Sequence, residues 1–168
     1  MKMTLKWNET DFKKKFGFNL DHIHREENRF HAIYFIDSLS GAVLISNQYS
    51  DKSAFSGGNE DLISGFLCAI NMFVRELNSE KEEIQEINFK DTRILYERKG
   101  RLVCIGISKK TNLQLERGIL HQVLLDFYEK FEQEISNFRG VIDPKMVSYQ
   151  NKLENVNLNS LFKFNLRV

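Results

Sequence analysis

The spacing of the strand-like segments constrains the fold of this chain more than any other feature. Apolar segments with strand character occur at residues 30–37 and 42–46, and a block of three more occupies residues 83–108. Only the stretch between 46 and 83 leaves room for a helix, because short turns join the other neighbours. Strands joined by short turns pair antiparallel. The pattern therefore predicts an α+β fold with a mainly antiparallel five-stranded sheet and helices packed on it.

The first two strands have the pattern of a hairpin. Residues 30–37, FHAIYFID, are apolar almost throughout, which is typical of a strand covered on both faces. The segment Ser38-Leu39-Ser40-Gly41 follows as a turn, in which Gly41 can adopt a positive φ. In the later block, EIQEINF, RILYE and RLVCIGIS are the three predicted strands.

Three helices are predicted by apolar periodicity. The first follows an N-cap at Asn59 and runs through EDLISGFLCAINMFVREL. The second runs from about Leu115 to Phe138, and the third begins at Pro144 and ends near Leu153. In the first helix two neighbouring rows of apolar side chains predict a wide stripe buried against the sheet. These rows are Leu62, Phe66, Phe73 and Leu77, and beside them Ile63, Leu67, Ile70 and Val74.

The chain divides into one domain and two flanking segments. Residues 1–29 are an N-terminal extension, residues 30–153 form the domain, and residues 154–168 are a C-terminal tail. The end of the tail, FKFNLRV, alternates apolar and polar residues with period two, which predicts an added β-strand. Two interpretations stay open for it: pairing with the sheet of its own chain, or β-augmentation onto a second subunit or partner.

Charge and cysteine content bear on the class of protein. Lys and Arg total 24 and Asp and Glu total 23, a balance that gives no support to nucleic-acid binding. The run Lys13-Lys14-Lys15 allows peripheral membrane contact at most. Two separated cysteines and the absence of a signal-like or membrane-spanning apolar run favour a cytoplasmic protein.

Motifs for catalysis, cofactors or metals are missing from the sequence. The phosphate-binding pattern GxxxxGK[ST] does not occur. His22 and His24 lack the further ligands that a zinc site needs. Cys68 and Cys104 lie among apolar residues, where cysteine acts as a small hydrophobe. We therefore predict no catalytic residue, no cofactor and no metal, and hence a protein that is not an enzyme.

Three blocks of sequence resemble longin-like domains and the related roadblock-like domains. These are the hairpin FIDSLSGAVLISNQYS, the helix EDLISGFLCAINMFVREL and the three-strand block EINFKDTRILYERKGRLVCIGIS. The resemblance spans about residues 30–153 and is greatest to the archaeal-type longin-like proteins associated with small GTPases. It implies a longin/profilin-like fold and no catalytic residue.

The resemblance also implies a binding role. Longin and roadblock domains typically dimerise and dock small Ras-like GTPases or vesicle-trafficking partners, so the expected partner is a small GTPase or a paralogous longin or roadblock protein, in a homo- or heterodimer. A small-molecule sensor of the PAS or profilin type is the alternative, because those domains enclose ligands with a similar sheet-and-helix plan. A deep apolar cavity would favour the sensor, and an exposed apolar patch would favour the platform.

Six residues are candidates for the interface. Gly65, Cys68 and Met72 form a smooth patch on the first helix, and Phe162, Phe164 and Leu166 lie on the apolar side of the predicted tail strand. A glycine inside a helix costs about 1 kcal/mol relative to alanine, so Gly65 needs a reason. Two reasons stay open: close packing on the protein's own sheet, or close approach by a partner.

Overall fold

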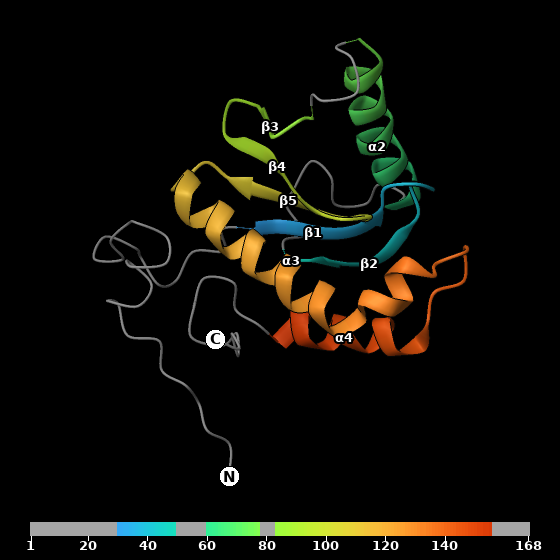
Figure 1. The fold of residues 1–168 in the computed structure, drawn as a ribbon. Helices are drawn as coiled ribbons and strands as arrows, with labels where there is room; N and C mark the ends of the chain where they lie inside the picture. Colours follow the sequence, from blue (N-terminus) through green and yellow to red (C-terminus); the bar gives the residue numbers. More distant parts are fainter. Residues whose placement is uncertain (1–29, 50–59, 78–82, 156–168) are drawn as a thin grey trace.

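The computed structural model describes residues 30–49, 60–77 and 83–155 (Figure 1). The predicted extension over 1–29, the N-cap Asn59 and most of the predicted tail lie outside these residues. In chain order the elements are β1 (Phe30–Asp37), β2 (Val43–Gln48), α2 (Glu60–Leu77), β3 (Glu86–Asn88), β4 (Thr92–Lys99), β5 (Leu102–Lys109), α3 (Leu113–Ser136) and α4 (Pro144–Asn155).

The five strands form one sheet in the order β2-β1-β5-β4-β3. All four pairings are antiparallel, and the short turns predict three of them; the fourth, between β1 and β5, joins strands that are far apart in the chain. The connection through α2 carries the chain from β2 at one edge to β3 at the other. The predicted fold class is confirmed: the structure is an α+β arrangement of one five-stranded antiparallel sheet with helices on it, in the predicted order of elements.

Helices cover both faces of the sheet, with α2 on one face and α3 and α4 on the other (Figure 1). All eight residues of β1 are buried, as expected for a central strand covered twice. On the α3 side the core is rich in aromatic rings. Phe35 stacks on Phe127 with a centroid distance of 4.3 Å, and Tyr149 meets Phe127 edge-on at 5.0 Å.

Turns and caps follow the predicted local signals. Gly41 has a φ of +73° in the first hairpin turn. The Asn112 side chain accepts a hydrogen bond from the Leu115 N–H at 3.1 Å and caps α3, which begins two residues before the predicted start. The Asp143 side chain accepts from the Lys145 N–H at 2.8 Å and caps α4. Gly140 has a φ of +101°, but it lies in the loop beyond Asn137, which is the residue that caps the end of α3.

The prediction of a wide stripe on α2 buried against the sheet is wrong for half of that stripe. Leu67 is buried, and Ile63, Ile70 and Val74 are half-buried. The other row points away from the sheet, with exposed fractions from 60% to 72%: Leu62, Phe66, Phe73 and Leu77. A straight helix meets a sheet along one narrow line of contact, so a stripe two rows wide leaves one row uncovered.

Candidate interaction surface

The exposed side of α2 carries a continuous run of apolar and small residues, which we call the α2 stripe. Its members recur every three or four positions and so share one helix face. They are Leu62, Gly65, Phe66, Ala69, Met72, Phe73 and Leu77.

Contacts on the opposite side of α2 fix the direction in which the α2 stripe points. Leu67 packs into the apolar cluster of this sheet face, and its carbonyl accepts a hydrogen bond from the Tyr96 hydroxyl at 3.5 Å. The Asn71 side chain accepts from the Arg98 guanidinium at 2.7 Å and from the Ile84 N–H at 3.4 Å. These bonds tie α2 to β4 and to the segment before β3, so the helix cannot turn its other row inward without losing them.

Gly65 lies within the α2 stripe and faces solvent. A Cβ atom built on Gly65 would meet no atom within 4 Å other than its own chain neighbours and helix backbone. Close packing on the protein's own sheet therefore does not account for this glycine. Close approach by a partner stays a prediction.

The other predicted interface residues are distributed differently. Met72 is 60% exposed and belongs to the α2 stripe. Cys68 is half-buried and turned toward Gly41 in the first hairpin turn. Burial, with the nearby Asp37 carboxylate, raises the pKa of the Cys68 thiol. Phe162, Phe164 and Leu166 lie outside the described residues.

The sequence analysis missed the large side chains of this surface, Leu62, Phe66, Phe73 and Leu77, by assigning them to the core. The signal that could have found them is the width of the apolar region, which exceeds what one sheet contact covers. Arg98 bonds both to Asn71 of α2 and to the carbonyl of Ile84, at 2.9 Å, just before the edge strand β3. The start of β3 therefore lies near α2. Phe89, just after β3, adds another exposed aromatic side chain at 47% exposure.

The reactive side chains Cys104 and Glu116 are buried, and their surroundings suit a structural role. Cys104 is fully buried, and burial raises the pKa of its thiol well above its usual range, which opposes thiolate chemistry. The buried Glu116 carboxylate lies 3.0 Å from the Arg93 guanidinium and accepts from the backbone and hydroxyl of Thr111, so its charge is already compensated. Within the described ranges, no three His, Cys, Asp or Glu side chains are grouped as a metal site would require.

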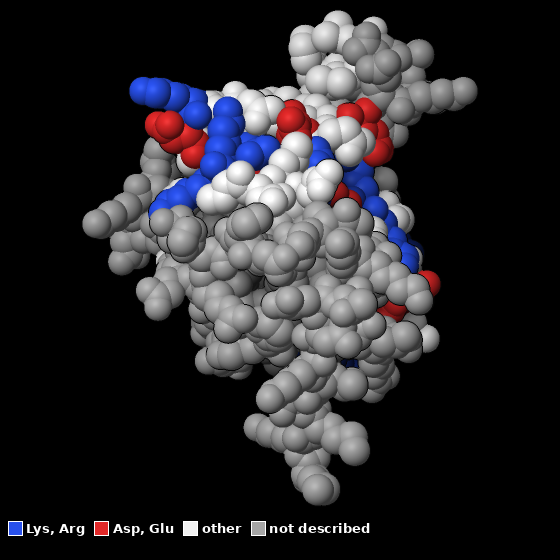
Figure 2. Space-filling view, turned by 90° about the vertical axis from the view of Figure 1, so that its left-hand side faces the viewer, with Lys and Arg blue, Asp and Glu red and all other residues white. Residues whose placement is uncertain are grey.

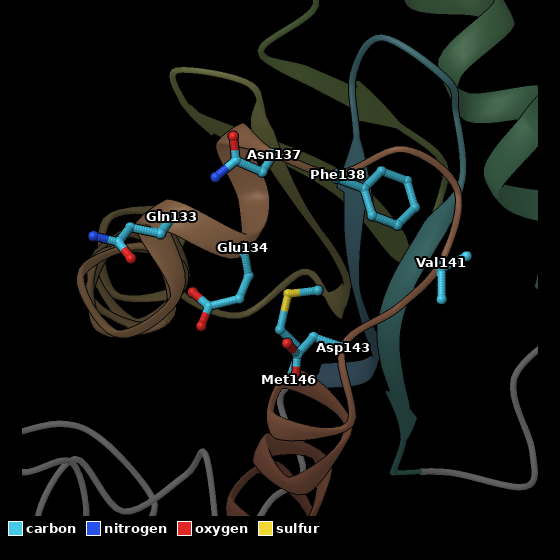
Figure 3. A pocket seen from close by; sticks show the side chains of 7 residues that line it. All are labelled: Gln133, Glu134, Asn137, Phe138, Val141, Asp143 and Met146. Carbon is cyan, nitrogen blue, oxygen red and sulfur yellow. The ribbon is translucent and has the colours of Figure 1, made fainter.

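A groove of about 320 Å³ lies outside the sheet, where the end of α3 meets the start of α4 (Figure 3). Phe138, Val141 and Met146 share its lining with four polar residues, among them the carboxylates Glu134 and Asp143. Figure 3 shows Gln133 turned away from the other side chains. Sensor sites are typically enclosed and apolar, so this polar groove is not the deep cavity that the sensor alternative predicts.

Several charged side chains of the described residues form ion pairs between elements. Arg117 contacts Glu86 at 2.9 Å and Glu97 at 3.4 Å, joining α3 to β3 and β4. Figure 2 shows basic side chains beside acidic ones across the described part of one face. Such a mixed surface has no single-sign field of the kind that draws a polyanion. Among the described helices, none combines the length and the apolar character needed to cross a bilayer.

Comparison with known proteins adds only a likeness of fold. No protein-family model matches the chain, and no curated protein sequence matches it. Among solved structures it is similar to Myxococcus xanthus MglB, with 16% sequence identity, 61% of this chain and 84% of that chain covered, and a TM-score of 0.47. A likeness at this level carries no information about activity or partner.

Proposed function

We propose that this chain is a non-catalytic interaction platform that dimerises through the α2 stripe and binds a small Ras-like GTPase or a trafficking-type partner. The observation that carries the proposal is the exposed α2 stripe itself. Contiguous apolar surface of this kind on a soluble domain marks an interaction site. Burying one Leu or Phe side chain stabilises a complex by about 1.5–3 kcal/mol before the costs of association are subtracted. Burial of a few such side chains is therefore enough to hold two proteins together.

A second copy of the same chain is the partner that the α2 stripe fits best. Gly65 and Ala69 lie one helical turn apart, which lets another helix approach closely at that point. Phe66 and Phe73 provide large side chains beside them. In a two-fold dimer the same surface serves both subunits, so the large side chains of one copy can fill the space above the small residues of the other.

The GTPase part of the proposal rests on the longin-like fold together with the sequence resemblance. The exposed side of α3 lies on the other face of the sheet from α2 and stays open to a second partner once the α2 stripe is covered. The proposal includes two further points: the chain is related to the archaeal-type longin-like proteins, and it is located in the cytoplasm. An exposed apolar helix face favours the platform over the sensor, whose ligand would need an enclosed apolar cavity.

Light scattering on purified protein tests the dimer. We expect a dimer for the native chain and at least about tenfold weaker self-association for Phe66→Asp, because the charge would be buried in the interface. Val141→Asp is the matched control, since Val141 is 86% exposed and lies outside α2, in the loop between α3 and α4. A native chain that stays monomeric at high concentration, or equal association of both variants, contradicts dimerisation through α2.

Calorimetric titration tests the partner. A small Ras-like GTPase from the same genome is loaded with GDP or with a non-hydrolysable GTP analogue and titrated into the protein. We expect saturable binding of at least one nucleotide form, and we expect Val141→Asp to bind like the native chain. Lack of binding by both forms of every such GTPase contradicts this half of the proposal and leaves the dimer to be judged separately.

A further inference from the structure

The outer edge of β2 offers backbone groups to a further strand. Among the described strands, β2 is the outermost on its side of the sheet. The Tyr49 N–H, just beyond β2, donates to the His31 carbonyl at 2.7 Å. In an antiparallel ladder the inward and outward groups alternate, and Ala32 opposes Gln48 in the register. The N–H and C=O of Gln48 therefore point to the outer edge, and those of Asn47 point toward β1.

The described part of the chain ends close to this edge. α4 runs alongside β2, and both elements end on the same side of the molecule (Figure 1). The Tyr49 hydroxyl donates to the Leu153 carbonyl at 3.1 Å, which ties the last turn of α4 to the end of β2. A chain that leaves α4 at Asn155 thus begins next to the end of β2, and to follow the edge it must run in the opposite direction.

Length and pattern of the following residues match that edge. Residues 156–161 can span up to about 20 Å, enough to turn the chain back beside β2. Residues 162–168 then alternate strictly, with Phe162, Phe164, Leu166 and Val168 on one side and Lys163, Asn165 and Arg167 on the other. This seven-residue segment is long enough to pair along all six residues of β2, Val43–Gln48.

We propose that residues 162–168 form a sixth strand, antiparallel to β2 and on its outer edge in the same chain. The strand satisfies the outward backbone groups of β2 and closes an edge that would otherwise be a template for pairing with other chains. It leaves the β3 edge and the α2 stripe uncovered. The inference does not depend on the proposed function, because the α2 stripe is contributed by a different element.

Amide hydrogen exchange by NMR on the full-length protein tests the strand. In the native chain we expect the Gln48 amide to be protected, like the Asn47 amide that β1 holds. The double variant Phe164→Asn with Leu166→Asn removes the apolar side of the strand, and we expect at least about tenfold faster exchange at Gln48 with Asn47 unchanged. The matched control, Lys163→Asn with Arg167→Asn, changes only the polar side and should leave both amides protected.

Unprotected Gln48 in the native chain, or equal exchange in both double variants, overturns the proposal. Nuclear Overhauser contacts between Gln48 and residues 162–168 of the native chain provide a readout that does not depend on any variant folding. Mixing labelled with unlabelled chains separates contacts within a chain from contacts between chains. Contacts found only between chains would overturn the intramolecular strand and assign the edge to a second copy.

Discussion

Gly106 in β5 shows how one residue sets the distance between the sheet and α3. A Cβ atom at this position would lie 2.9 Å from the Phe30 ring and 3.0 Å from a Leu120 methyl group. Both neighbours are buried and cannot move freely. We expect Gly106→Val to lower the free energy of unfolding by about 2 kcal/mol, measured by urea denaturation, because overpacking forces the core apart.

Gly65 supplies the matched control for this prediction. A methyl group at Gly65 meets open space, and alanine is favoured over glycine inside a helix by about 1 kcal/mol. We therefore expect Gly65→Ala to leave stability unchanged or raise it. Equal destabilisation by the Gly106 and Gly65 substitutions would show that space around the glycine is not the deciding factor.

The helix α2 has two apolar faces, and among the described residues only one of them packs against the sheet. Replacing Gly65 by leucine separates the two roles, since the side chain would extend from the exposed face without touching the sheet. We expect Gly65→Leu to weaken self-association at least about tenfold, measured by sedimentation equilibrium, because the bulk would hold the second helix away. At concentrations at which both chains are monomeric, the unfolding midpoint should stay that of the native chain.

A dimer unaffected by Gly65→Leu would place its interface elsewhere on the molecule. A loss of stability without a change of association would instead mean that Gly65 packs within its own chain. Gly65→Ala, with a smaller side chain at the same position, should weaken association less than leucine does.

Distant parts of the molecule are held together by the buried carboxylate of Asp37. It accepts hydrogen bonds from the Ser40 N–H at 2.9 Å and from the Arg101 guanidinium, and Arg101 also donates to the Phe138 carbonyl at 2.8 Å. One cluster thus joins the β1–β2 turn, the β4–β5 turn and the end of α3. Burial alone would raise the pKa of Asp37, but the bonds from Arg101 and Ser40 outweigh it and hold the pKa below its ordinary value of 3.8.

A lowered pKa in the folded state makes this cluster sensitive to acid. Its contribution to stability is present above the unfolded pKa of about 3.8 and is lost as the pH falls through the folded pKa. We expect Asp37→Asn to lower the urea midpoint at pH 7, with a smaller difference from the native chain at pH 3. Equal differences at both values would mean that the Asp37 charge contributes nothing to stability.

The sequence by itself determined the elements and their pairing. Alternating and unbroken apolar strands, a glycine turn at Gly41 and a helix start at Pro144 are local signals, and a local signal acts within a few residues of the chain. Short turns between strands leave antiparallel pairing as the only simple arrangement. For these reasons the order of elements along the chain, the antiparallel sheet and the positions of α3 and α4 agree with the prediction, apart from shifts of a few residues at their ends and a kink at Phe131 inside α3.

Only the tertiary structure decided which face of α2 stays outside. Both rows of the helix are apolar, so periodicity cannot distinguish the row of Leu67 from the row of Phe66. The choice depends on groups far away in sequence, such as the bond from Arg98 to Asn71, which joins residues 27 positions apart. The same holds for the link from Arg101 to Asp37, 64 positions apart. Contacts of this kind join residues that only the assembled fold brings together, and they select one of two faces that the helix presents equally.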